Sequence, residues 1–106
     1  MSKANFNEIL FESVHEAFET ALGQIVSEPL ALHMRRYLGI SNDALPNHII
    51  SLLTPLDYSY GLAGDILGKT IVKRMYKKAG LPFYEVGSRP TLEYVQELRR
   101  KLVSLD

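Results

Sequence analysis

The spacing of apolar residues is the feature that most restricts how this chain can fold. In three long segments, 6–26, 60–79 and 91–105, an apolar residue returns at every third or fourth position. That period matches one face of an α-helix, whereas a half-buried strand would alternate apolar and polar residues. We therefore predict an all-α protein, a compact bundle of about five helices with negligible sheet. Residues 1–106 should form a single helical domain.

Caps and prolines define where the first two helices begin and end. Asn5 or Asn7 can cap the first helix, because a short polar side chain accepts from the free backbone donors there. Pro29 lacks a backbone donor and clashes with the preceding turn, so the helical pattern should restart near it. We expect Ser27 to cap the second helix and Gly39 to end it in a left-handed conformation.

Two further helices follow in the middle of the chain. A short helix should lie between Pro46 and Pro55. Its inner face should be formed by Ile49, Ile50, Leu52 and Leu53. The longest helix, 60–79, should end at Gly80. We expect it to occupy the centre of the bundle and to pack against residues 30–38 and the last helix.

The last helix should begin after a break in the helical period. Segment 81–90 should break the helical pattern, with residues 83–86 extended or at most a short strand, and Thr91 or Ser88 should cap the helix over 91–105. The predicted core residues of the whole chain are Leu22, Val26, Leu30, Met34, Leu38, Ile49, Leu52, Leu67, Ile71, Met75 and Leu98.

One motif in the longest helix, Gly68-Lys69-Thr70, matches the end of a phosphate-binding P-loop. A P-loop also needs a glycine at position 63 and a buried strand before the motif, but this chain has Ala63 after a proline-bearing turn. We therefore interpret the motif as helix and not as a nucleotide site.

Glycines at helical spacing suggest a close contact instead. Gly61, Gly64 and Gly68 share one face of the longest helix. Because an interior glycine costs about 1 kcal/mol relative to alanine, three on one face indicate that another backbone packs very close to them. A larger side chain at Gly64 should therefore overpack the contact.

Composition excludes several classes of function. The chain has no cysteine, which excludes disulfides, thiolate metal sites and cysteine nucleophiles. No apolar run approaches the roughly 20 residues of a membrane helix, and the N-terminus has no apolar signal core. We expect a cytoplasmic protein with no membrane contact. Acids outnumber bases in 1–56 and bases outnumber acids in 57–106, an asymmetry that can serve attraction within the fold, between subunits or toward a partner.

The histidines and hydroxyl residues show no catalytic or metal-binding pattern. His15, His33 and His48 are not spaced to place two ligands on one helix face. We therefore predict no metal, no cofactor, no catalytic residue and no enzymatic activity. His33 should face the interior and bond to a backbone carbonyl, although a ligand held through it stays open.

A basic cluster in the second half of the longest helix has two interpretations. It comprises Lys69, Lys73, Arg74, Lys77 and Lys78. We favour a solvated helix face, in which Asp65 and Lys69 form a pair four residues apart. The same residues are the candidate contacts for a protein partner or for the phosphates of a nucleic acid.

The segment from Leu22 to Leu81 resembles a small archaeal family, the Nitrosopumilus-type output domain. The residues that carry the resemblance are Leu22, Gly23, Val26, Leu30, His33, Met34, Leu38, Gly39, Ile40, Leu45, Pro46, the apolar run 49–53, Ile66, Leu67, Val72, Met75, Tyr76, Gly80 and Leu81. The resemblance implies a compact helical module with a regulatory or interaction role. It brings no catalytic residues with it.

We therefore expect a non-enzymatic regulatory or signalling module that acts through protein–protein contacts, with nucleic-acid binding through the basic helix face as the alternative. A homodimer is also expected, because apolar residues at the start of the chain and in segment 81–90 exceed what one small core readily covers. The candidate dimer contacts are Phe6, Leu10, Phe11, Phe83 and Tyr84. The acidic first helix would pair with the basic half of the other subunit.

Overall fold

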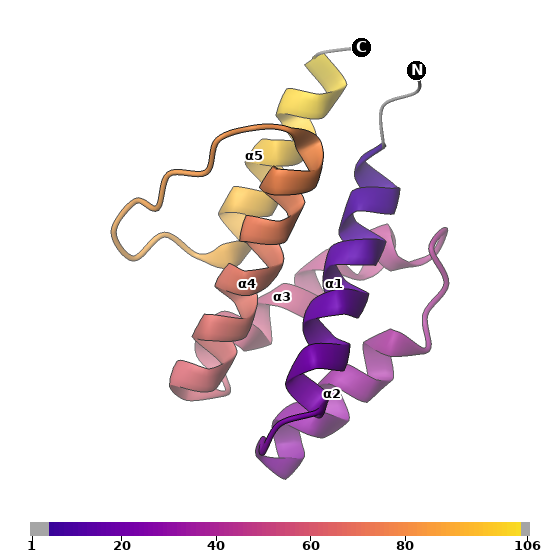
Figure 1. Ribbon diagram of the computed structural model, residues 1–106, viewed down its shortest axis with the longest axis vertical. Coiled ribbons are helices and arrows are strands. Elements are labelled where there is room, and N and C mark those ends of the chain that lie inside the picture. The colour runs from indigo at the N-terminus through magenta and orange to yellow at the C-terminus, as the bar shows by residue number, and fades with distance from the viewer. Residues whose placement is uncertain (1–4, 105–106) are drawn as a thin grey trace.

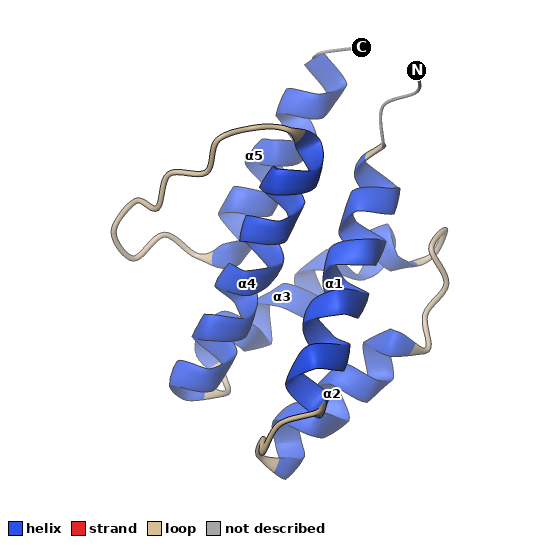
Figure 2. Ribbon diagram, in the orientation of Figure 1, coloured by secondary structure: helices blue, strands red, loops and turns tan. Residues whose placement is uncertain are grey.

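The computed structural model describes residues 5–104, and helices account for all of the regular secondary structure in that part of the chain (Figure 2). The elements are α1 (Phe6–Leu22), α2 (Glu28–Leu38), the 3₁₀ turn η1 (Leu45–His48), α3 (Ile49–Tyr58), α4 (Gly61–Ala79) and α5 (Thr91–Ser104). The prediction of an all-α bundle is confirmed. Leu105, which we placed in the last helix, lies outside the described residues.

Local caps set most of the predicted helix ends. The Asn5 side chain accepts a hydrogen bond of 2.9 Å from the Glu8 backbone N–H and so caps α1. Ser27 Oγ accepts from the Leu30 N–H at 3.4 Å, with Pro29 in the first turn of α2. Gly80 ends α4 in the left-handed conformation, with φ of 72°. These three predictions are confirmed.

Four local expectations are wrong. Helix α1 ends at Leu22, so Ile25 and Val26 lie in the turn before α2 and not on the helix. Gly39 ends α2 with φ of −83°, which any residue can adopt. Pro55 does not end α3 but lies inside it. The helix continues past this residue, and the Pro55 carbonyl accepts a hydrogen bond of 2.8 Å from the Ser59 N–H. Ile50 is 65% exposed and points away from the core.

Helix α4 is central, but its main neighbours are α1 and α3, followed by α5 (Figure 1). The expected packing of α4 against residues 30–38 is wrong, because α1 lies beside α4 and α2 packs on α1. Apolar residues of all the helices meet in one core. Most of the predicted core residues are buried. Three of them are only half-buried at the edge of the core, namely Leu22, Val26 and Leu38.

Two glycines of α4 lie where other chain segments come very close. A Cβ atom at Gly64 would be 2.6 Å from the Leu56 carbonyl oxygen of α3. A Cβ atom at Gly68 would be 2.5 Å from the Thr91 hydroxyl oxygen at the start of α5. The predicted close approach of another backbone is therefore confirmed at Gly64, whereas the close neighbour of Gly68 is the Thr91 side chain. Gly61 has no such neighbour and instead provides the positive φ of 62° that begins α4.

The start of α5 is held by a residue that is distant in the sequence. The Thr91 backbone N–H donates to both carboxylate oxygens of Asp57, at 3.1 and 3.0 Å. Neither Thr91 nor Ser88 acts as the cap that we expected, since the acceptor comes from the last turn of α3. This bond joins α3 to α5 beside the close contact at Gly68, and it suits the positive end of the α5 dipole.

Segment 81–90 leaves the bundle as an extended loop (Figure 1). The Tyr94 hydroxyl accepts from the Val86 N–H at 2.7 Å. Phe83 packs with its ring centroid 5.3 Å from that of Tyr76 and 5.1 Å from that of Tyr94. The predicted break in the helical pattern is confirmed, and residues 83–86 are neither helix nor strand.

The contact at Gly64 predicts a large effect from one methyl group. Gly64→Ala should lower the free energy of unfolding by about 1–3 kcal/mol, because the Leu56 carbonyl cannot move without displacing α3. This loss should outweigh the better helix propensity of alanine. Urea unfolding measures it. The control is Gly39→Ala, whose Cβ would be no closer than 3.8 Å to a neighbour, and it should leave stability unchanged or raise it by up to about 1 kcal/mol. Equal effects at the two positions would contradict a close contact at Gly64.

Candidate functional site

Two members of the basic cluster are engaged by the acidic face of α1. Arg74 donates to Glu16 at 3.1 Å, and Lys78 lies 3.0 Å from Glu16 and 3.5 Å from Glu12. The hydrogen bond from Lys78, with the nearby Arg74, lowers the pKa of Glu16, and the same bond raises the pKa of Lys78. The charge asymmetry between the two halves of the chain is thus used, in part, inside the fold.

Lys69 is not on a solvated face, contrary to our expectation. Only 15% of its side chain is exposed, and it donates to the Arg89 carbonyl at 3.0 Å. Its Nζ lies 5.3 Å from the Tyr94 ring centroid and 3.9 Å from the predicted partner Asp65. Lys69 therefore fastens the end of segment 81–90 to α4.

The two remaining lysines of the cluster stay available. Lys73 and Lys77 are exposed on α4, and neither forms an ion pair within residues 5–104. Of the predicted contact residues, only these two lysines remain without an ion-pair partner among the described residues. The neighbouring Arg74 is already paired with Glu16 of α1.

The predicted dimer contacts do not form one surface. Phe6 and Leu10 are buried in the core of their own chain, so neither can contact a second copy. Phe11 is half-buried, with its ring centroid 4.1 Å from that of His15. Phe83 is half-buried where segment 81–90 packs against the core. Tyr84 alone is well exposed, at 75%. The first helix covers its own core because its apolar face meets α4 and α2.

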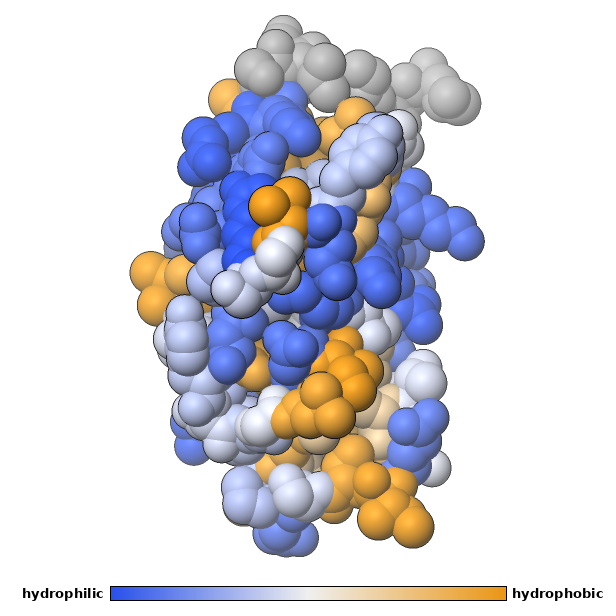
Figure 3. All heavy atoms as spheres, turned by 90° about the vertical axis from the view of Figure 1, so that its left-hand side faces the viewer, coloured by the Kyte–Doolittle hydropathy of each residue, from blue (hydrophilic) through white to orange (hydrophobic). Residues whose placement is uncertain are grey.

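A groove that the sequence analysis did not find lies between α1 and α4. This α1/α4 groove has a volume of about 390 Å³ and lies between the end of α1, the turn before α2 and the first half of α4. Its apolar lining includes Ala17, Ala21, Val26, Ala63, Ile66 and Leu67. Apolar groups gather at the lower end of the face shown in Figure 3, over the start of α4.

Exposed apolar side chains surround the α1/α4 groove. Ile25, at its edge, is fully exposed, Ile66 is 56% exposed, and Leu62, one turn before Ile66, is 74% exposed. The sequence could have indicated this surface, because Leu62 and Ile66 are apolar but lie outside the predicted core face of α4. The prediction missed it because it placed Ile25 and Val26 on a continuous first helix.

His33 is a buried structural residue. Its Nε2 atom lies 2.9 Å from the Leu52 carbonyl oxygen, as predicted, and its ring is flanked by Tyr37 and Tyr60 with centroids at 4.9 and 5.3 Å. Burial lowers the pKa of His33, and the charge of Arg36 lowers it further, while the bond to Leu52 opposes the shift. Within residues 5–104 no three histidine or carboxylate side chains gather as a metal site would require.

Comparisons with family models, with curated proteins and with solved structures find no match for this chain. The resemblance to the Nitrosopumilus-type output domain therefore stays a prediction. No helix among the described residues combines the length and apolarity needed to cross a bilayer. A functional assignment has to start from the α1/α4 groove and the two free lysines.

The buried His33 predicts a loss of stability at mildly acidic pH. Because its folded pKa lies below the unfolded value of about 6.5, its contribution is complete above about pH 6.5 and is lost as the pH falls through the folded pKa. Between about pH 7.5 and 5.5 the free energy of unfolding should therefore fall, because the unfolded chain binds a proton at this group more readily than the folded one. His33→Phe should remove that part of the fall, whereas His48→Gln, at an exposed position, should keep it. An unchanged pH dependence in His33→Phe would contradict the assignment.

Proposed function

We propose that this chain is a non-enzymatic interaction module that binds an acidic amphipathic helix of a protein partner in the α1/α4 groove. The observation that carries the proposal is an open apolar groove continued along the same helix by two lysines that no acid of the described chain neutralises. The regulatory or signalling character, and a place in the cytoplasm, are proposed from the resemblance and the composition alone.

The shape of the groove suits a helix. Three of its lining residues are alanines, Ala17, Ala21 and Ala63, which leave a low floor between two helices. Ile25 and Ile66 also line the groove, and both expose apolar surface that water solvates poorly. An exposed apolar patch on a small domain usually marks an interface. A partner helix can cover it by inserting residues at positions i, i+3, i+4 and i+7.

The charges next to the groove select the partner. Lys73 lies about two helical turns after Ile66, and Lys77 lies about one turn further on the same side of α4. A helix that runs along α4 with its apolar face in the groove would pass these lysines with its next turns. Carboxylates at those positions would neutralise both cations and fix the direction of binding.

A second copy of this chain is not the occupant that we favour. The expected dimer would pair the acidic face of α1 with the basic half of α4, but Glu12 and Glu16 make that pairing inside one chain. Nucleic acid is also less favoured, because within the basic cluster of α4 only Lys73 and Lys77 form no ion pair with the described residues and remain free to contact phosphates. Two phosphate contacts give weak binding with a shallow salt dependence.

Binding of a designed peptide tests the proposal. The probe is a fluorescein-labelled helical peptide with leucines on one face and glutamates on the others, and its matched control has lysines in place of the glutamates. The acidic peptide should bind at least about tenfold more tightly than the basic one, by fluorescence anisotropy. Ile66→Asp should weaken binding by about tenfold or more, because it places a charge in the groove.

Controls separate the groove from general stickiness and from nucleic-acid binding. Val103→Asp changes an exposed apolar residue of α5, 67% exposed, and should leave peptide affinity unchanged. Lys73→Glu with Lys77→Glu should remove the preference for the acidic peptide. The proposal fails if both peptides bind alike or if Ile66→Asp binds as the wild type. A DNA oligonucleotide that binds more tightly than the acidic peptide, with sensitivity to the lysine changes alone, would assign the surface to nucleic acid.

A further inference from the structure

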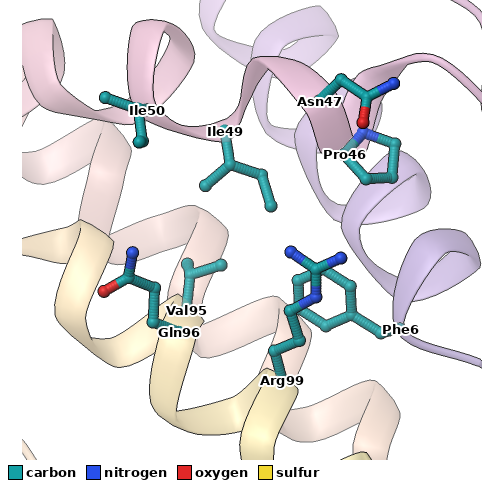
Figure 4. A pocket seen from close by; sticks show the side chains of 8 residues that line it. All are labelled: Phe6, Pro46, Asn47, Ile49, Ile50, Val95, Gln96 and Arg99. Carbon is teal, nitrogen blue, oxygen red and sulfur yellow. The ribbon is translucent and has the colours of Figure 1, made fainter.

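A second cavity, separate from the α1/α4 groove, lies among the start of α1, η1, the start of α3 and α5 (Figure 4). Its volume is about 140 Å³, and none of its lining residues lines the groove. Phe6, Pro46, Ile49 and Val95 form apolar walls. The polar groups at its rim are the Asn47 and Gln96 amides and the Arg99 guanidinium.

Arg99 is the charged group among the described residues that line this cavity, and no acid of residues 5–104 forms an ion pair with it. Its guanidinium carbon lies 5.2 Å from the Phe6 ring centroid, a cation–π arrangement that holds the group beside an apolar wall. Figure 4 shows the guanidinium directed from α5 into the gap below η1, with Ile49 entering the same gap from α3. Arg74 and Arg89 each pair with a glutamate, whereas Arg99 forms no ion pair with any described residue.

The carboxylates nearest to Arg99 along α5 are already engaged. Glu97 lies 2.6 Å from Arg89 and 3.3 Å from Lys101, and these contacts lower its pKa, chiefly through the bond to Arg89. Glu93 also lies within 4.0 Å of Arg89. Neither glutamate is therefore a competitor for Arg99. Lys101 is paired with Glu97, whereas Arg99 and Arg100 form no ion pair with the described residues.

From this arrangement we propose that the cavity binds a small organic carboxylate with an apolar aromatic or branched body. The carboxylate would lie against the planar fork of Arg99, which matches two oxygens at once. The apolar body would fill the space between Ile49, Val95 and Phe6. A phosphate fits less well, because the described residues that line the cavity offer no second cation and the walls would desolvate its remaining oxygens.

Titration of the full chain with sodium benzoate tests this proposal. In ¹⁵N–¹H correlation spectra, benzoate should cause saturable shifts confined to the amides of the start of α1, η1, the first turn of α3 and the middle of α5. Benzamide, which has the same shape without the charge, should bind at least about tenfold more weakly. Arg99→Gln should reduce benzoate affinity by a similar factor, and Arg99→Lys should lose part of it because an ammonium cannot form the fork.

Arg100→Gln is the matched control, since it removes a neighbouring positive charge of α5 that does not line the cavity. It should change benzoate affinity by less than about twofold. The spectrum of each variant reports whether the fold is retained. The proposal is overturned if benzoate causes no saturable shift, if benzamide binds equally well, or if Arg99→Gln and Arg100→Gln behave alike. Ile66→Asp should not affect benzoate binding, because Ile66 does not line the cavity. The proposal for this cavity and the proposal for the α1/α4 groove can therefore be tested independently.

Discussion

The close approach of α3 and α5 to the glycine face of α4 is the contact on which the rest of the fold depends. At Gly64 the α3 backbone lies where a side chain would otherwise be, and at Gly68 the Thr91 side chain of α5 occupies that space. This proximity brings Asp57 to the start of α5, where both of its carboxylate oxygens accept from the Thr91 N–H. The relative placement of α3, α4 and α5 therefore depends on having glycine, which lacks a Cβ atom, at positions 64 and 68.

The other side of α4 is organised by charge as well as by apolar packing. Glu16 lies between Arg74 and Lys78 and joins the acidic face of α1 to the second half of α4. These half-exposed pairs add little stability individually, but they use acids that a partner or a second subunit could otherwise have contacted. The surface that remains is the apolar groove at the start of α4 and the two lysines further along it.

Features that depend on residues three or four positions apart could be predicted from the sequence. The Asn5 and Ser27 caps, the left-handed Gly80 and the glycine face of α4 are of this kind, because helix geometry alone places the interacting groups together. The inward position of His33 was predicted from its apolar neighbours Leu32 and Met34, of which only Met34 is buried. The error at the end of α1 came from passing over a local signal, because Gly23 caps the helix with its N–H bonded to the Thr20 and Ala21 carbonyls. At Pro55 the helix continues, since a proline removes one backbone donor but leaves the carbonyl free to accept.

The sequence by itself determined the class of the fold, the extent of most helices and the absence of cysteine chemistry, because these follow from local spacing and composition. Only the tertiary structure decided which cations stay free, since the partners of Arg74 and Lys78 come from a helix distant in the chain. It also placed Ile25 beside Ile66, and Arg99 beside the cavity under η1. Such sites depend on how separate helices pack, and no residue spacing within one helix contains that information.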